Sequence, residues 1–316
     1  MPLFSRIVII GVGLIGGSIG LAVKKRQLTG NVIGVDLNEE RLHTARQLGA
    51  VDQITTNLDE GINNDTGIAA PENAGADTGA FTPSSLPGTE LVIVATPVSM
   101  VPDHVWQVAS AVQTGGINYR NVLIADVGST KETICSRLSQ RTLPNGCRFI
   151  GSHPIAGKEK SGVEHADADL FENRLVVITP TASARDRDIG LLIQFWRSLG
   201  SLTASMSPTE HDRTLARTSH LPHLLSALLA DRLQLQDVQY TGPGYHSTTR
   251  LASGLPELWR DIVSHNTEAI LEAIRDYENA LRDLREKIER NDWEAVARFL
   301  EHAKKNRDML TLRPNP

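Results

Sequence analysis

The sequence contains little cysteine: only Cys135 and Cys147 occur among 316 residues. Two cysteines do not provide the framework of several disulfides on which small secreted domains rely. This low content is typical of a reducing compartment, and we expect the protein to be cytoplasmic. The length exceeds that of one ordinary hydrophobic core, so about two domains are expected.

The sequence also lacks an excess of basic residues. Lys and Arg number 32 against 37 Asp and Glu, which gives a net charge of −5. Proteins that neutralise nucleic-acid phosphates usually carry a basic excess or a basic stripe, and neither is visible in this chain. We therefore expect the partner to be a small-molecule substrate and not a nucleic acid.

No apolar run has the length of a membrane-spanning helix. The stretch that comes nearest extends from Ile7 to Val23 and has no charged residue. It falls short of the ~20 residues that a spanning helix needs. Its glycines begin directly after the first expected strand, where a turn would place them, so we expect no membrane association.

Short apolar, β-branched runs alternate with helical patterns over the first two thirds of the chain. The expected strands are residues 6–10, 31–35, 91–95, 122–125, 149–150, 175–178 and 201–206. Continuously apolar strands that alternate with helices are typical of a parallel sheet covered on both faces. We therefore predict an α/β, Rossmann-type and mostly parallel sheet domain over residues 1–206.

The rest of the chain, residues 207–316, is nearly all helical in pattern and predicts an all-α C-terminal domain. The expected helical stretches are residues 209–235, 256–290 and 292–310. Their charged faces and long amphipathic stripes favour pairing with a second copy of the chain. A homodimer through this domain is the expected assembly.

Residues 61–89 interrupt the alternation of strands and helices within the first domain. They are rich in Gly, Ala, Asn, Asp, Thr and Pro and have few large apolar side chains. This composition is typical of a surface loop. We expect a loop insertion here and assign it no function.

The glycines after the first expected strand form the pattern Gly11-x-Gly13-x-x-Gly16. The pattern follows a strand and opens a helix, which is the context in which it binds a dinucleotide. The first glycine allows a tight turn, the second lets a pyrophosphate approach the backbone, and the third lets the helix pack on the strand. We expect cofactor contacts from these glycines and from Leu14 and Ile15, with an ordinary tight turn as the alternative.

Asp36 ends the second expected strand, 20 residues after Gly16. A carboxylate at this place accepts hydrogen bonds from the ribose 2′-hydroxyl of NAD and repels the 2′-phosphate of NADP. We favour NAD, although Arg41 nearby leaves NADP open, and helix capping is the alternative role for Asp36. Thr96 and Pro97 follow another expected strand and should lie along the nicotinamide end of the cofactor.

Hydride transfer from an alcohol requires a group that accepts the hydroxyl proton. A histidine is suitable because its ordinary pKa of ~6.5 lies near the working pH. His153 in "GSHPIAG" is the first candidate, because it follows a strand and lies among glycines that let a ligand approach. Ser129 in "ADVGSTK" is the second candidate, with capping of the next helix as its alternative role.

The whole chain resembles the prephenate/arogenate dehydrogenases of tyrosine biosynthesis. The resemblance rests on "VGLIGGSIGLA", "ADVGSTK", "GSHPIAGKEKSGVEHADADLF", "TSHLPHLLSALLA" and "TTRLASGLPELWRDI", in the order of the family. It implies NAD-dependent oxidation with loss of CO₂, from prephenate to 4-hydroxyphenylpyruvate or from arogenate to tyrosine. His153 would accept the hydroxyl proton and Ser129 would orient the reacting groups while the ring becomes aromatic.

The resemblance also implies substrate contacts beyond the first domain. His220 and His223 of "SHLPH" are three residues apart and share one helix face, and Pro222 is expected to kink that helix. By resemblance His223 contacts the substrate or the nicotinamide, and His220 supports it. Arg250 matches the arginine that binds the ring carboxylate, and Glu159 matches a position that organises the site. No cluster of carboxylates or cysteines completes a metal site around the two histidines.

Other functions stay open at the level of the sequence. A β-hydroxyacid-type dehydrogenase normally uses a lysine on the helix after the domain junction, where this chain has "SHLPH". A dinucleotide sensor without turnover would keep the glycines but would not need both His153 and Arg250. Residues 246–249, His-Ser-Thr-Thr, replace the acidic residue and phenylalanine that many relatives have before the arginine. This departure leaves the choice between prephenate and arogenate open.

Overall fold

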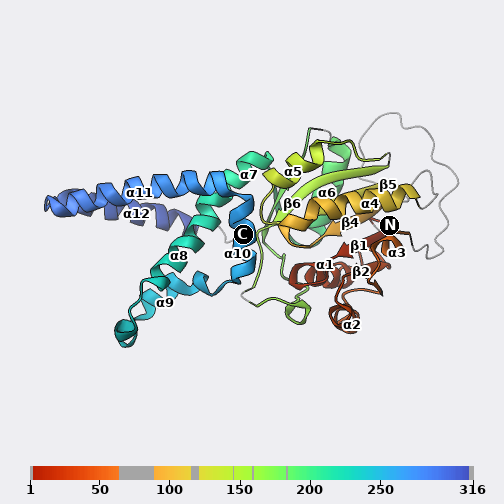
Figure 1. Ribbon diagram of the computed structural model, residues 1–316, viewed down its shortest axis with the longest axis horizontal. Coiled ribbons are helices and arrows are strands. Elements are labelled where there is room, and N and C mark those ends of the chain that lie inside the picture. Colours follow the sequence, from red (N-terminus) through yellow and green to blue (C-terminus); the bar gives the residue numbers. More distant parts are fainter. Residues whose placement is uncertain are drawn as a thin grey trace. The chain divides into compact units, whose positions relative to one another are not determined.

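The computed structural model describes residues 3–63, 89–114, 121–144, 146–158, 160–182 and 184–312. The chain divides into two compact units, Met1–Pro208 and Thr209–Pro316. The first unit holds the β-strands and the second is built of helices, as the ribbon in Figure 1 shows.

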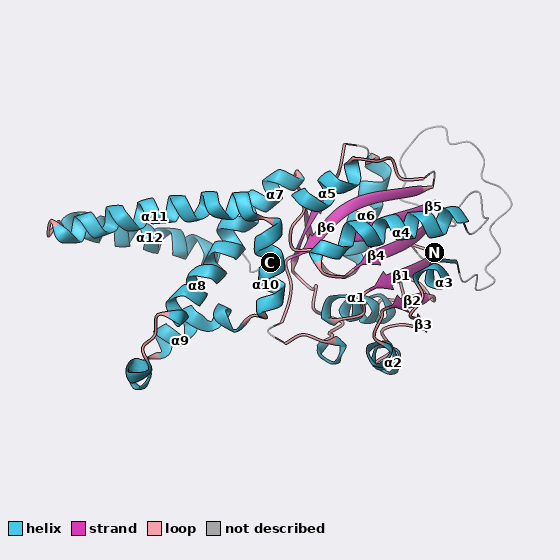
Figure 2. Ribbon diagram, in the orientation of Figure 1, coloured by secondary structure: helices cyan, strands magenta, loops and turns pink. Residues whose placement is uncertain are grey.

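The strands of the first unit form one eight-stranded sheet in the order β3-β2-β1-β4-β5-β6-β7-β8 (Figure 2). Neighbouring strands are parallel except for β6 and β7, which are antiparallel. The strands are β1 (Arg6–Ile10), β2 (Val32–Val35), β3 (Gln53–Thr55), β4 (Thr89–Val94), β5 (Asn121–Asp126), β6 (Cys147–Pro154), β7 (Leu175–Thr179) and β8 (Leu202–Ser205). The order from β3 to β6 is that of the doubly wound dinucleotide-binding fold, which reverses direction between β1 and β4. The predicted Rossmann-type class is confirmed.

Helices cover both faces of this sheet. Ile7 and Ile9 of β1 belong to a core with helices α1, α2 and α6, whereas Val8 and Ile10 belong to a second core with α3, α4 and α5. Successive side chains of a strand point to opposite faces, so two cores along one strand mean that both faces are buried. The helices are α1 (Leu14–Lys25), α2 (Glu39–Gln47), α3 (Leu58–Asn63), η1 (Val98–Met100), α4 (Val101–Thr114), α5 (Glu132–Ser139), η2 (Val163–His165) and α6 (Asp186–Ser198).

Strand β6 differs from its prediction. The sequence predicts a strand over residues 149–150 that ends before His153, whereas the structure has β6 over Cys147–Pro154. The second half of β6 pairs with the antiparallel strand β7, which places His153 opposite Val177. Pairing with a strand more than twenty residues away therefore lengthens β6, and the expectation that His153 follows its strand is wrong.

The predicted insertion overlaps regular structure at both of its ends. Residues 61–63 are the last residues of α3, and Thr89 is the first residue of β4. The intervening residues 64–88 lie outside the described residues.

The second unit consists of helices, and its predicted all-α character is confirmed (Figure 2). The elements are α7 (Pro208–Leu215), η3 (Ala216–His220), α8 (Leu221–Asp231), η4 (Leu235–Tyr240), α9 (Pro243–Thr249), η5 (Arg250–Ser253), α10 (Pro256–His265), α11 (Thr267–Glu289) and α12 (Trp293–Leu312). Helices α11 and α12 contact each other and form a long hairpin (Figure 1). Asn291 in the turn between them has φ of 55°, a left-handed conformation that asparagine tolerates better than most residues.

The helical unit has a small core of its own. The buried cluster consists of Ala216, Leu221, Ile270 and Ala273. Several large apolar side chains of the unit are exposed, among them Leu281 and Leu300. None of the helices in the described part of the chain combines the length and hydropathy required to cross a bilayer.

Candidate active site

The turn between β1 and α1 has the shape of a phosphate cradle. Gly11 has φ of +89°, and a Cβ there would lie 2.7 Å from the carbonyl oxygen of Ala95. A Cβ on Gly16 would lie 2.0 Å from the carbonyl oxygen of Gly11, so neither position tolerates a side chain. Around Gly13, in contrast, a Cβ would meet nothing within 4 Å, which leaves room for a ligand against the backbone.

The N-terminus of α1 adds an electrostatic attraction for anions at this turn. Gly13 is the N-cap residue and supplies no side-chain cap, and the first turn, which includes Leu14 and Ile15, has no acidic residue. The free N–H groups of a helix N-terminus and its dipole favour a bound phosphate. The geometry therefore fits the pyrophosphate of a dinucleotide.

Asp36 fastens the end of β2 to the glycine turn. Its side chain is only 7% exposed. Oδ2 accepts a hydrogen bond from the Val12 N–H at 3.1 Å, and Oδ1 accepts one from the Asn38 N–H at 3.0 Å. The guanidinium of Arg41 lies 3.0 and 3.1 Å from the two oxygens. A carboxylate has about four acceptor positions, and these contacts use them, so a ribose hydroxyl would take the place of an Arg41 contact.

The alternative role of Asp36 as a helix cap is wrong. The N-cap of α2 is Asn38, whose side chain accepts a hydrogen bond from the Arg41 N–H at 2.9 Å.

Thr96 and Pro97 lie at the end of β4, beside the glycine turn. The methyl group of Thr96 would be 3.0 Å from a Cβ on Gly11. The segments that follow β1 and β4 therefore lie close together. The Thr96 hydroxyl lies 2.9 Å from Nδ1 of His104 in α4. Burial lowers the pKa of His104, against a smaller opposing effect of Asp103. Sequence reasoning missed His104, because no pattern marks it out on an ordinary amphipathic helix.

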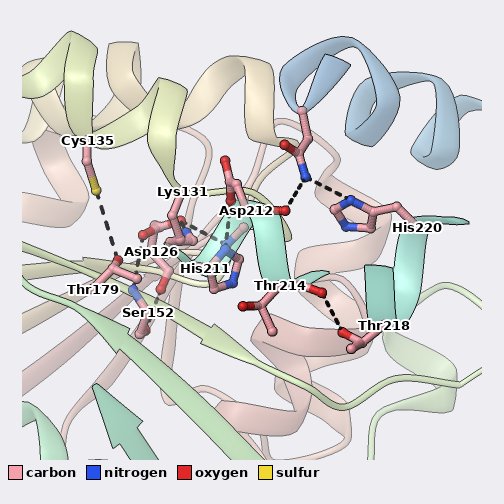
Figure 3. A network of polar contacts seen from close by, with 12 residues as sticks. Asp126, Lys131, Cys135, Ser152, Thr179, His211, Asp212, Thr214, Thr218 and His220 are labelled. Carbon is pink, nitrogen blue, oxygen red and sulfur yellow. Dashed lines mark hydrogen bonds and ion pairs between the residues drawn. The ribbon is translucent and has the colours of Figure 1, made fainter. Parts of the chain in front are cut away.

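A buried ion pair lies at the end of β5, the strand next to β4 in the sheet (Figure 3). Asp126 and Lys131 form a salt bridge in which both side chains have no exposed surface. The Asp126 carboxylate also accepts hydrogen bonds from the N–H of Gly128 at 2.9 Å and of Ser152 at 3.3 Å. The Ser152 hydroxyl donates to the backbone oxygen of Asp126 at 2.6 Å. The loop after β5 is thereby tied to β6.

Two of the predicted catalytic residues are close in sequence to members of this network. Ser129, half-buried, lies inside the loop that the Asp126–Lys131 pair closes. His153 follows Ser152 in β6 and is 9% exposed. The N-cap of α5 is Lys131, so the capping alternative for Ser129 is wrong.

The segment after β6 packs on α1. A Cβ on Gly17 would lie 2.9 Å from Val163, and the Ser18 hydroxyl accepts a hydrogen bond from the Asp167 N–H at 2.9 Å. Lys158 pairs with Asp167 at 2.9 Å. Glu159, predicted to organise the site, lies outside the described residues.

The "SHLPH" segment begins in a π-helical turn. In this turn, η3, the Leu221 N–H donates to the Ala216 carbonyl, five residues earlier. Pro222 follows and has no N–H, and its ring would collide with a carbonyl in a regular α-helical continuation. The wider turn removes this collision, and π-turns are frequent at functional sites. The Thr218 hydroxyl donates to the Thr214 carbonyl at 2.8 Å and satisfies it (Figure 3).

His220 and His223 pack against the same side chain, Trp259 of α10. The ring of His223 stacks on the indole with centroids 3.4 Å apart and planes at 10°. The ring of His220 meets it edge-on, with centroids 6.2 Å apart and planes at 81°. Gly254 makes this cluster possible, because a Cβ there would lie 2.6 Å from the indole nitrogen and 2.8 Å from Cε1 of His223. Trp259 and Gly254 were missed from the sequence, although they lie in the matched segment "TTRLASGLPELWRDI".

Burial disfavours a positive charge on both rings. Desolvation lowers the pKa of His220 to about 4, with Asp212 opposing and His211 and His223 reinforcing the shift. Desolvation also lowers the pKa of His223. An ordinary core position would account for their exposed fractions of 1% and 6%, but it would not explain why two histidines contact one tryptophan.

Arg250 lies at the junction of α9 and η5 and is exposed. Its element η5 contacts α8. The Ala252 N–H donates to the hydroxyl of Ser226 at 3.2 Å, which fastens η5 to the helix that carries His223. An exposed guanidinium fork on a braced turn is suited to a carboxylate. Among the described residues, no three His, Cys, Asp or Glu side chains gather in a way that would hold a metal ion.

An open, doubly wound sheet with a bare glycine turn after β1 defines a nucleotide-binding protein of the Rossmann class. The family models described as "Prephenate dehydrogenase, nucleotide-binding domain" and "Prephenate dehydrogenase, dimerization domain" match residues 61–204 and 207–302. The chain is 32% identical to the prephenate dehydrogenase of Bacillus subtilis (strain 168), over 97% of this chain and 76% of that protein. The chain belongs to the prephenate dehydrogenase family, and the resemblance inferred from the sequence is confirmed.

Solved structures agree with this membership. The prephenate dehydrogenase from A. aeolicus in complex with hydroxyphenyl propionate and NAD⁺ matches with a TM-score of 0.81 and 28% identity, over 97% of this chain and 98% of that one. The arogenate dehydrogenase of Synechocystis matches with a TM-score of 0.74 and 25% identity, over 96% of this chain and 99% of that one.

Breaking the buried ion pair from one side should destabilise the first unit, because it leaves an unpaired buried charge. Lys131→Met leaves the Asp126 carboxylate buried without its cation, and we expect the free energy of unfolding to fall by ~3–5 kcal/mol. The double variant Asp126→Asn/Lys131→Met should recover part of this loss, because no charge is left buried, although the single amide oxygen can accept from only one of the N–H groups of Gly128 and Ser152. Urea titration measures all three proteins.

A control for this experiment is Lys304→Met, which removes the lysine of an exposed pair with Asp308 at 2.6 Å. Exposed pairs contribute little, so its unfolding midpoint should not move. A Lys131→Met protein as stable as the unmodified chain would contradict the structural role of the buried pair.

Proposed function

We propose that the chain catalyses the NAD-dependent oxidative decarboxylation of prephenate to 4-hydroxyphenylpyruvate, or of arogenate to tyrosine, in tyrosine biosynthesis. The observation that carries this proposal is the glycine turn, closed to side chains at Gly11 and Gly16 and open to a ligand at Gly13, in a chain of this family. Relatives named as prephenate and as arogenate dehydrogenases both support it, so the choice of substrate stays open.

The residues of the turn fit NAD. The glycines with Leu14 and Ile15 would hold the pyrophosphate at the N-terminus of α1, and Asp36 would accept from the adenine ribose. Thr96 and Pro97 would line the nicotinamide end, at the edge where β4 ends. Bound NAD⁺ supplies the hydride acceptor.

His153 and Ser129 carry the proton chemistry in this proposal. His153 accepts the proton of the 4-hydroxyl group, Ser129 orients that hydroxyl, and C4 loses a hydride to become a carbonyl carbon. The bond from the ring to the carboxylate then breaks, its electron pair enters the ring, and CO₂ leaves. His153 returns its proton to the resulting phenolate oxygen, so the protein gains and loses no proton over the cycle.

The second unit holds the anionic substrate. Arg250 would bind the ring carboxylate with its fork of donors, and His223 would meet the substrate or the nicotinamide, supported by His220. Glu159 keeps its proposed organising role from the resemblance alone. A β-hydroxyacid-type enzyme or a sensor without turnover is less consistent with the two matching family models.

The helical unit would also form a homodimer. Its buried cluster is small, whereas large apolar side chains on α11 and α12 are exposed: Leu271, Tyr277, Leu281, Ile288, Trp293, Phe299 and Leu300. Apolar surface of this extent usually marks an interface.

Analytical ultracentrifugation should give twice the chain mass of 34.5 kDa, and Leu281→Lys/Leu300→Lys should shift the protein toward monomer. A monomer at micromolar concentration in the unmodified protein would refute this assembly. The cytoplasmic location stays a prediction.

The activity is tested by NADH absorbance and CO₂ release with prephenate and with arogenate. We expect turnover of at least one of them, and His153→Asn should lower kcat by ~10²–10⁴ because asparagine cannot take up a proton. NAD⁺ affinity should not change, since the glycine turn is untouched. His302→Asn on the exposed face of α12 is the matched control and should behave as the unmodified enzyme. Absence of turnover with both substrates rejects the function; a folded His153→Asn enzyme with near-normal kcat rejects the base.

The cofactor preference depends on Asp36 and Arg41. In Asp36→Ser the repelling carboxylate is gone and Arg41 loses its partner, so Arg41 can pair with a 2′-phosphate. We expect the ratio of kcat/KM for NADP⁺ to that for NAD⁺ to rise by roughly 10- to 100-fold. The double variant Asp36→Ser/Arg41→Ala should lose most of this gain, and Asp59→Ser at an exposed position of α3 should show none. Equal use of both cofactors by the unmodified enzyme would overturn the assignment.

A further inference from the structure

Asn266 lies at the junction between α10 and α11 and is 5% exposed. Its side-chain Nδ2 donates to the backbone oxygen of Asp212 at 2.8 Å and lies 3.0 Å from Nδ1 of His220. The carboxamide therefore connects α7 to the "SHLPH" segment inside the helical unit.

These two contacts determine where the proton of His220 resides. A backbone carbonyl only accepts, so the atom of Asn266 that faces Asp212 must be the NH₂ group and not the oxygen. The same NH₂ group faces His220, and an NH₂ group only donates. Nδ1 of His220 must therefore be the unprotonated, accepting nitrogen, and the ring proton is on Nε2.

We propose that Asn266 is a positioning residue that fixes His220 as the neutral Nε2–H tautomer and so makes it a permanent hydrogen-bond donor beside His223. The tautomer follows from contacts within the helical unit. Only its use, donation to an acceptor oxygen of the bound substrate, rests on the proposed function.

The arrangement is the reverse of the one that makes a histidine a base. A carboxylate or carbonyl at Nδ1 holds the proton there and leaves Nε2 free to accept. An amide NH₂ at Nδ1 leaves Nε2 protonated. It also opposes a second proton on the ring, because that proton would point at another donor.

The charged and titratable neighbours do not reverse this assignment. Asp212 attracts a positive charge on His220, but its carboxylate lies 2.7 Å from Nδ1 of His211 and is shared with that ring. His211 and His223 oppose a charge on His220, and the edge of its ring meets Trp259. His220 is thus held neutral among groups of mixed sign, and Asn266 selects the tautomer.

The tautomer is measured directly in the unmodified protein. Long-range ¹H–¹⁵N correlation spectra of protein with ¹⁵N-labelled histidine distinguish a protonated from an unprotonated ring nitrogen, and the signal missing in His220→Gln assigns the residue. We expect Nε2 protonated and Nδ1 bare from about pH 9 down to about pH 5. A proton on Nδ1, or a doubly protonated ring near pH 6.5, overturns the proposal whether or not the enzyme turns over.

Asn266→Asp tests the consequence for substrate binding. The new carboxylate can no longer donate to the Asp212 carbonyl, but it can accept from Nδ1–H and favours a charged ring. His220 should then donate from Nε2 at low pH and lose that proton as the pH rises. We expect the substrate KM of this variant to rise by roughly 10- to 100-fold from the acidic to the basic side, with kcat and the KM for NAD⁺ little changed. The unmodified enzyme should show no such rise.

Matched variants separate positioning from folding. Asn306→Asp makes the same substitution beside an exposed histidine, His302, 3.2 Å away on α12, and should change neither KM nor its pH dependence. His220→Gln keeps an N–H near the position of Nε2 and should retain most of the affinity, whereas His220→Leu should lose it. A pH-independent KM in Asn266→Asp, or equal losses in His220→Gln and His220→Leu, contradicts the donor role. If neither the unmodified protein nor any variant turns over substrate, the proposed function is rejected, whereas the assignment of the tautomer is unaffected.

Discussion

The parallel sheet imposes the constraint on which the first unit depends: strands that run together end at one edge. Ile10, Val94 and Asp126 are in register across β1, β4 and β5, so the segments that follow these strands begin side by side. Gly11 donates its N–H to Val35 at 2.8 Å, which joins the glycine turn to the end of β2 as well. Residues that are far apart in the sequence thus reach one edge without any long-range pairing of side chains.

That edge contains polar groups in a region from which water is largely removed, and each group needs a partner. Asp126 shows how the requirement is met: one carboxylate satisfies a lysine and two backbone N–H groups. An apolar pair of the same volume would be as stable or more stable, but it would not join the loop of Ser129 to β6. The ion pair therefore serves the geometry of the site more than the stability of the fold.

The sequence predicts this edge well, because strand ends, glycines and acidic residues leave local patterns. The glycine turn and the place of Asp36 follow from spacing alone. The extension of β6 does not, because its second half exists only through pairing with β7. The burial of Lys131 cannot be predicted from the sequence either, because nothing in the local sequence distinguishes a buried lysine from an exposed one. Arg250 and Glu159 came from the resemblance and from no pattern in the residues themselves.

The helical unit was predicted less completely, because its candidate site also depends on contacts between residues that are far apart in the sequence. Spacing places His220 and His223 on one face, but the π-turn before Pro222 and the tryptophan between the rings depend on packing of α8 against α10 and η5. Asn266 gives no signal in the sequence, since an asparagine between two helical stretches is an ordinary helix boundary. Its effect arises only when a carbonyl fixes the orientation of its amide.

Three histidines are thus distinguished by their neighbours and not by their residue type. Burial lowers the pKa of His220 and His223, so neither ring is suited to carry a positive charge in the helical unit. In the proposed function, the anionic substrate finds its formal positive charge in Arg250, whose guanidinium stays protonated wherever it lies. The proposed proton acceptor is His153 on the sheet, whose strand is held to Asp126 through Ser152. In this proposed scheme a histidine of the sheet unit moves a proton, and the histidines of the helical unit keep theirs.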